Sequence, residues 1–218
     1  MNAANLRSLL DAALADLTGA QEELRELDAA VGDGDLGITV SAGARAVRAA
    51  VGELPAGTSA ADVVKAAGRA FAGGNPSTFA ALVGGGVMAS GKVFADADDV
   101  TRADVAAFAR AVTDRIMVKG KAELGDKTIL DALVPTVDLL EHADPGTPPR
   151  DLLQAMVATA AEAVRVTSQL QNRRGRAAWL GERSSGHPDP GATAYLRFLE
   201  ALARAWKTIE RPATGGGL

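Results

Sequence analysis

Three features of the sequence predict an all-α fold. Hydrophobic residues make up 47% of the chain, with alanine prominent among them, whereas aromatic residues make up only 4%. Alanine and leucine are strong helix formers, while the aromatic and β-branched residues that favour strands are sparse. Apolar residues recur at helical spacing in one segment after another, and Gly- or Pro-containing turns separate these segments. We therefore expect about eight helices and no strand.

Length and charge limit the class of protein. A chain of 218 residues is long enough for one domain with a substantial core. We expect a single domain over residues 1–212 and a disordered tail over residues 213–218. The net charge of −4 argues against sequence-independent binding to nucleic acid. No apolar run is long enough to cross a membrane, no secretory signal is evident, and the lack of cysteine suits a reducing cytosol. We therefore expect a cytoplasmic protein without membrane or nucleic-acid partners.

The first three helices are predicted from leucine spacing and turn residues. From Leu6 to Leu17 the apolar residues follow the i, i+3, i+4, i+7 pattern of one buried face. Gly19 interrupts this pattern, and a second short helix is expected over residues 21–29. A third helix is expected over residues 36–51, before a turn that contains Gly52 and Pro55.

Two further helices are expected before residue 100. Ser59 and Asp62 suit a capping box at the start of the fourth helix. In the next turn Asn75 suits an N-cap and Pro76 the first helical position. The following helix contains glycines 84–86, each of which weakens a helix by roughly 1 kcal/mol relative to alanine. Either this helix breaks at the glycines, or another backbone packs very close to it.

Four helices are expected in the second half of the chain. A polar turn over residues 120–128 separates the first two, and Asp126 or Thr128 is the expected cap of the second. Pro135 lies inside that second helix and should kink it. The loop over residues 144–149 is interpreted as a connection between helices rather than between domains. The other three helices are expected over residues 101–118, 150–172 and 190–207.

An acidic turn is the first candidate functional site. Asp28, Asp33 and Asp35 lie within eight residues, and the last two alternate with glycine. Clustered carboxylates repel one another unless a cation neutralises them, and Mg²⁺ prefers oxygen ligands of this kind together with phosphate oxygens. Ca²⁺ fits less well, because no glutamate follows at the position that an EF-hand loop requires. The alternative is a solvated turn in which Asp35 is the N-cap of the next helix.

A basic loop over residues 173–192 is the second candidate. It holds four arginines, whose planar and permanently charged groups suit phosphate. Asp189, Pro190 and Gly191 begin the last helix, where backbone N–H groups and the helix dipole favour an anion. The alternative is a solvated basic loop. Together with the acidic turn, this loop indicates a nucleoside di- or triphosphate bound through a metal and helix N-termini.

Three motifs resemble the L subunit of the dihydroxyacetone kinase family, and the resemblance covers almost the whole chain. They are LDAAVGDGDLG at 27–37, GKAELGDKTILD at 120–131 and GRAAWLGERSSGHPDPGA at 175–192. The resemblance implies a closed antiparallel barrel of eight helices. It also implies that ADP or ATP and two Mg²⁺ ions bind at one end of this barrel.

The resemblance also implies roles for particular residues. Asp28, Asp33 and Asp35 match the metal-binding aspartates and, with Arg176, form the expected catalytic group. The positions that match the family's nucleotide contacts are Leu36, Gly37, Ile38, Thr39, Gly74, Asn75, Pro76, Ser77, Gly120, Thr128, Ile129, Arg176, Asp189, Pro190 and Gly191. Two residues depart from the family pattern: Leu36 replaces a histidine, and Pro76 replaces a serine that touches phosphate.

The expected function is transfer of a phosphoryl group to a short-chain keto-sugar held on a separate K subunit. The phosphoryl donor stays open between ATP and a phosphotransferase-system subunit that rephosphorylates bound ADP. One alternative is a nucleotide-binding regulatory module with impaired transfer, which Leu36 and Pro76 favour. Another is an ATP-dependent kinase subunit for a different small sugar, such as a tetrulose.

Overall fold

The computed structural model describes residues 1–95, 99–175, 178, 181–182 and 184–209, and this part of the chain is helical without a strand. The 3₁₀ turns η1 (Thr18–Ala20) and η2 (Gly91–Phe94) accompany the α-helices. The α-helices are α1 (Ala3–Leu17), α2 (Gln21–Val31), α3 (Leu36–Gly52), α4 (Ala60–Gly74), α5 (Thr78–Ser90), α6 (Arg102–Gly120), α7 (Leu130–His142), α8 (Pro149–Thr167) and α9 (Pro190–Ile209). The predicted all-α class is confirmed.

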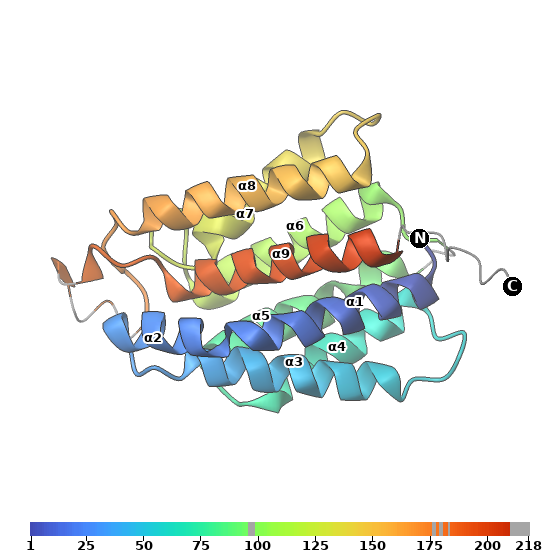
Figure 1. Cartoon of the computed structure of the whole chain (residues 1–218), viewed down its shortest axis with the longest axis horizontal. Helices are drawn as coiled ribbons and strands as arrows, with labels where there is room; N and C mark the ends of the chain where they lie inside the picture. The colour runs from blue at the N-terminus through green and yellow to red at the C-terminus, as the bar shows by residue number, and fades with distance from the viewer. Residues whose placement is uncertain (96–98, 176–177, 179–180, 183, 210–218) are drawn as a thin grey trace, which may run out of the picture.

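The helices form a closed antiparallel barrel (Figure 1). Helices α1 and α2 run in the same direction through η1 and act as one broken rod. Each rod packs against the next one along the chain, and α9 returns to pack against α1 and α8, so the ring closes. Because neighbouring rods alternate in direction, the connections after α2, α4, α6 and α8 all lie at one end of the barrel.

Close helix packing explains the glycines inside α5. This helix runs unbroken through residues 84–86. A Cβ atom on Gly84 would lie 2.5 Å from the carbonyl oxygen of Gly68 in α4 and 2.7 Å from the backbone nitrogen of Ala72. The second of the two sequence interpretations, close approach of another backbone, is therefore the one that the structure supports.

The start of α5 and the end of α8 differ from the predicted boundaries, and several other helix ends differ by one or two residues. Helix α5 begins at Thr78, and its N-cap is Ser77, whose hydroxyl accepts a hydrogen bond from the Ala80 N–H at 3.1 Å. The predicted N-cap Asn75 has an extended backbone, and its amide instead reaches across to α3. Helix α8 ends at Thr167, five residues before the predicted end at residue 172.

Tertiary contacts cause the early end of α8. The Thr167 hydroxyl accepts a hydrogen bond from the Asp189 N–H at 2.9 Å, and the Asn172 N–H donates to the Ser184 hydroxyl at 3.0 Å. These partners draw residues 168–172 away from the helical path. Within the described residues, no helix is both long enough and apolar enough to cross a membrane. The predicted tail over residues 213–218 lies outside the described residues.

Candidate functional site

The acidic turn brings its three aspartates together at the end of α2. One carboxylate oxygen from each of Asp28, Asp33 and Asp35 lies within 4.8 Å of the others. Asp28 is half-buried in the last turn of α2, whereas Asp33 and Asp35 are exposed. The Asp28 carboxylate also accepts a hydrogen bond from the Leu36 N–H at 3.2 Å, which ties the turn to the start of α3. This set of oxygen donors fits a hard divalent cation.

Asp35 does not act as the helix cap that the alternative interpretation requires. It occupies the N-cap position of α3, but its side chain makes no capping hydrogen bond. Desolvation raises the pKa of the Asp35 carboxyl, and the nearby charge of Asp28 raises it further. A bound cation would relieve this electrostatic cost, so the geometry favours the metal interpretation over simple capping.

The start of α3 exposes only one of its four predicted nucleotide contacts. Leu36, Gly37 and Thr39 are buried, whereas the Ile38 side chain is 48% exposed. A Cβ atom on Gly37 would lie 2.0 Å from the Gln21 carbonyl oxygen, so this glycine permits α2 and α3 to pack closely. Leu36 belongs to the hydrophobic core, which means that its side chain serves packing.

The turn after α4 is linked to the start of α3. The Asn75 side-chain amide donates to the Thr39 hydroxyl at 2.9 Å. A Cβ atom on Gly74 would lie 2.9 Å from the Cα atom of Gly43, again between helices. Pro76 is exposed. The structure thus places the predicted contacts of α3 and of this turn side by side.

The loop after α6 has its own internal support. The Asp131 carboxylate accepts hydrogen bonds from the Gly125 and Thr128 N–H groups, both at 2.6 Å. The Thr128 hydroxyl accepts from the Leu130 N–H, whereas Asp126 bonds back to the Glu123 N–H within the loop. The N-cap of α7 is Ile129, which makes no side-chain capping hydrogen bond, so the prediction of Asp126 or Thr128 as the cap is wrong.

The starts of α7 and α9 meet at the same end of the barrel. A Cβ atom built on Gly191 would lie 3.4 Å from the Ile129 backbone nitrogen and 3.4 Å from the ring of Phe79 in α5. Two predicted nucleotide contacts that are distant in sequence are therefore neighbours. Gly120 is the last residue of α6, before the loop that leads to α7. A Cβ atom built on Gly120 would lie 3.4 Å from the Leu82 side chain.

The Asp189 carboxylate accepts a backbone hydrogen bond at the start of α9. This carboxylate is buried, and the donor is the Ala192 N–H at 2.7 Å. Burial raises the pKa of this carboxyl to about 7. This N-terminus already has a carboxylate of its own, so an external anion would meet competition there. The predicted contact Arg176 lies outside the described residues.

Sequence reasoning missed three residues that shape this end of the barrel. Asp131 accepts hydrogen bonds from the loop after α6. The sequence signal for this role was its position three residues after Thr128, because capping pairs have this spacing. Lys127 and Asn172 are buried polar residues of the two long loops. Their partners are distant in sequence, so no local pattern identified them.

The barrel and its acidic turn define a helical domain with a candidate metal–phosphate site. The family model described as the DAK2 domain matches residues 30–204. The chain therefore belongs to the DAK2 domain family, which confirms the resemblance seen in the motifs.

Named relatives fall into two groups. The chain is 37% identical over 183 residues to L-erythrulose 1-kinase of Mycolicibacterium smegmatis, covering 84% of this chain and 32% of the relative. It is 32% identical over 192 residues to the ADP-binding subunit DhaL of the PEP-dependent dihydroxyacetone kinase of Escherichia coli, covering 85% and 89%. This chain thus spans about a third of the erythrulose kinase but most of the DhaL subunit.

A solved structure supports the same fold. The dihydroxyacetone kinase from C. freundii in complex with AMP-PNP and Mg²⁺ matches with a TM-score of 0.72 and 26% identity. The match covers 91% of this chain and 33% of that one.

Proposed function

We propose that this chain is the Mg²⁺-nucleotide-binding unit of a dihydroxyacetone-type kinase. It would supply the phosphoryl group that passes to a short-chain keto-sugar held by a separate K unit. The observation that carries this proposal is the cluster of three carboxylates within 4.8 Å. The cluster lies at an end of a barrel whose solved relative was crystallised with AMP-PNP and Mg²⁺.

Asp28, Asp33 and Asp35 would hold two Mg²⁺ ions. When bound, the ions supply positive charge that neutralises the nucleotide phosphates during transfer. The chain's own residues then bind and orient the nucleotide. Thr39 and Asn75 fix the turns beside the acidic cluster, while Ile129 and Gly191 form a second contact region. Phosphoryl transfer depends mainly on positioning and electrostatics, so the chain need not supply a general base.

The partner and the phosphoryl donor follow from the family as proposals. A K unit would bring the sugar, and either ATP or a phosphotransferase-system subunit would recharge the nucleotide. Such a system would operate in the cytoplasm. The DhaL relatives belong to PEP-dependent kinases, whereas the solved relative binds AMP-PNP and Mg²⁺, so both donors stay open.

A second candidate is a kinase unit for a tetrulose. It is favoured by the 37% identity to two erythrulose kinases, against 32% for the Escherichia coli DhaL subunit. The regulatory alternative rests on Pro76, which has no N–H to offer to phosphate. The neighbouring Ser77 hydroxyl is used as the cap of α5, so it does not simply replace the missing serine.

The experiment begins with the purified chain, which is denatured so that any bound nucleotide can be identified. Calorimetry with ADP and ATP, each with and without Mg²⁺, follows. Mg²⁺-dependent binding supports the proposal, and co-purified ADP that resists exchange favours a phosphotransferase-system donor. Transfer to dihydroxyacetone and to erythrulose with an added K unit separates the two substrates. If no nucleotide binds with Mg²⁺, the proposal is wrong.

A further inference from the structure

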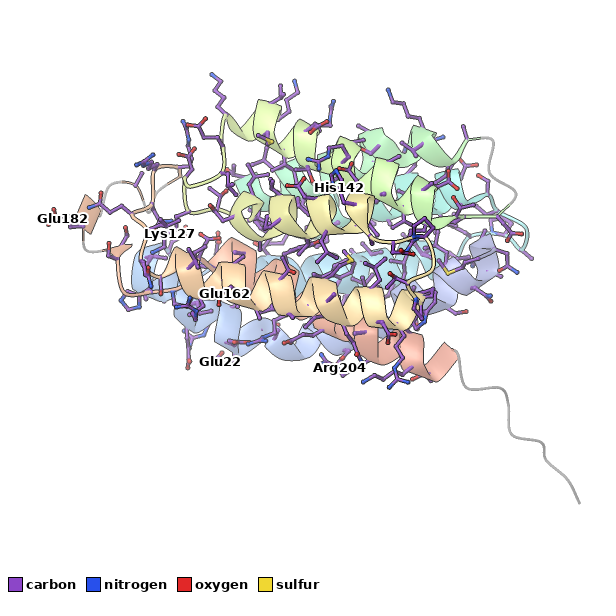
Figure 2. The ribbon with its side chains drawn as sticks, turned by 90° about the horizontal axis from the view of Figure 1, so that it is seen from above. Glu22, Lys127, His142, Glu162, Glu182 and Arg204 are labelled. Atoms are coloured by element: carbon purple, nitrogen blue, oxygen red, sulfur yellow. The ribbon has the colours of Figure 1, made fainter. Side chains whose placement is uncertain are left out.

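Lys127 is a buried cation at the loop end of the barrel. Its side chain is only 1% exposed, although it carries an ammonium group. Figure 2 shows Lys127 at the same end as Glu182 and further inside the molecule. Taking an ammonium group out of water costs several kcal/mol unless hydrogen bonds compensate for it. The hydrogen-bond partners of Lys127 therefore show which part of the structure its buried ammonium group stabilises.

The ammonium group of Lys127 binds two carbonyl groups of the segment between α8 and α9. Its Nζ atom donates to the Leu170 oxygen at 3.0 Å and to the Ser184 oxygen at 2.5 Å. The Lys127 backbone has a φ of 59°, a left-handed conformation that is uncommon for a residue with a side chain. Its own carbonyl oxygen accepts a hydrogen bond from the Asn172 side chain at 3.1 Å.

The residue before Lys127 binds the same segment. The Asp126 carbonyl oxygen accepts from the Arg173 N–H at 3.0 Å, and the Asp126 carboxylate pairs with Arg174 at 2.6 Å. Burial raises the pKa of Asp126, but hydrogen bonds from Arg174 and the Glu123 backbone and the charges of Arg174 and Arg173 together outweigh it, so the pKa is lowered. Asp126 and Lys127 thus both bind residues near the start of the segment between α8 and α9, and Lys127 also binds Ser184 near its end.

These attachments join the two helix starts, those of α7 and α9, that form the second proposed contact region for the nucleotide. Two residues beyond Lys127, Ile129 lies against Gly191. The segment that Lys127 holds leads directly into Asp189 and α9. The charge of Asp189 also acts on Lys127 and counters the lowering of its pKa by burial. Lys127 is therefore placed to set the spacing between the starts of α7 and α9.

We infer that Lys127 is a positioning residue of the nucleotide site. It joins the segment after α8 to the start of α7, so that Ile129 and Gly191 face the nucleotide together. This inference rests on the proposed function for its ligand, an adenine nucleotide with Mg²⁺. Lys127 acts through the backbone that it holds and does not itself touch the phosphates.

The central test compares Lys127→Met with Lys121→Met. Methionine keeps the apolar stem but removes the ammonium group, so the Leu170 and Ser184 carbonyl groups lose their shared donor. The dissociation constant for Mg²⁺-ADP, measured by calorimetry, should rise about 10- to 100-fold, as expected when one or two charge-assisted hydrogen bonds are lost. Lys121 is a matched control, because it is exposed, belongs to the same loop and also has a positive φ of 49°. Its substitution should leave the affinity unchanged.

Two further measurements separate positioning from general damage. With a K unit and sugar, the KM for the nucleotide should rise in Lys127→Met while kcat at saturating nucleotide is retained. The chain contains no cysteine, so Lys127→Cys can be aminoethylated uniquely in denaturant and refolded. This treatment restores an ammonium group at nearly the original length, and the affinity for Mg²⁺-ADP should recover.

Hydrogen exchange tests the same inference without nucleotide. The Asn172, Arg173 and Gly186 amides donate to Ser184, Asp126 and Ser168, respectively. They should lose protection in Lys127→Met but not in Lys121→Met. If Lys127→Met does not fold, Asn172→Ala removes one bond to Lys127 and should give a smaller change in the same direction.

Failure of the inference about Lys127 can be distinguished from failure of the proposed function. Wild-type affinity in a folded Lys127→Met variant would overturn the inference, as would a fall in kcat at unchanged KM. Failure of aminoethylation to restore affinity would also contradict it. If the wild type binds no Mg²⁺-nucleotide, the proposed function is wrong, and unchanged exchange in Lys127→Met would then refute the positioning role independently.

Discussion

Substitution of Asp35 by asparagine should have opposite effects on stability without and with Mg²⁺. The change removes one of three clustered charges but retains the size of a side chain at the N-cap position of α3. Without metal, the variant should be more stable than the wild type, because repulsion from Asp28 is lost. With Mg²⁺ and ADP, the wild type should gain stability that the variant lacks.

The size of the effect follows from the geometry. At 4.8 Å, the upper limit of the separations in this cluster, two unit charges repel by about 0.9 kcal/mol in water and by about 3.5 kcal/mol at an effective dielectric constant of 20. Asp33 and Asp35 are exposed, so the lower value is more appropriate. Loss of the repulsion from Asp28 therefore gives a gain of about 1 kcal/mol at low salt. Ligand at one hundred times its dissociation constant should stabilise the wild type by about 2.7 kcal/mol.

Asp35 also makes the stability of the wild type depend on pH. Because the pKa of Asp35 is raised in the folded protein, the folded state holds this proton to higher pH than the unfolded state does. The wild type therefore loses stability as the pH rises through the interval just above the ordinary value of 3.8. The advantage of Asp35→Asn should appear over that interval and shrink as the carboxyl becomes protonated in acid.

The assay is urea unfolding followed by circular dichroism, first in EDTA and then in Mg²⁺ with ADP. Asp114→Asn is the matched control, since it removes one exposed negative charge from the middle of α6. It should give neither a gain of about 1 kcal/mol nor a loss of the Mg²⁺ effect. The reasoning would be refuted if Asp35→Asn were less stable than the wild type in EDTA and still fully stabilised by Mg²⁺ with ADP.

Three further predictions concern the fold and its end turns. Gly84→Ala should lower the free energy of unfolding in urea by about 1–3 kcal/mol, because its Cβ would meet the α4 backbone. Gly85→Ala is the control: nothing lies within 4 Å of its Cβ, so it should not destabilise the protein. Ser77→Ala should cost about 1 kcal/mol in the same assay, because α5 loses its N-cap, and an unchanged urea midpoint would contradict this role. Asp189→Asn should gain stability relative to the wild type between pH 4 and the wild-type pKa of about 7, because deprotonation of the buried carboxyl weakens the wild type. Parallel stability–pH curves from thermal unfolding would exclude that assignment.

The sequence alone determined most helices and the acidic turn. Apolar spacing located the buried faces, and Thr101 and Ser59 marked helix starts that the structure confirms. These features are local: a side chain three or four residues away decides them, so they can be read from short windows. The grouping of Asp28, Asp33 and Asp35 is local for the same reason, because all three belong to one turn.

Only the tertiary structure decided which segments meet. Asn75 was expected to cap α5, but its partner is Thr39 in α3, and the cap passed to Ser77. Helix α8 ends early because Thr167 has a partner more than 20 residues away. Lys127 reaches across to Ser184, and Gly191 lies against Ile129, only because the barrel closes and brings the loops of alternate helices to one end. Local spacing encodes faces and caps, whereas partners distant in sequence are fixed by the packing of the whole ring.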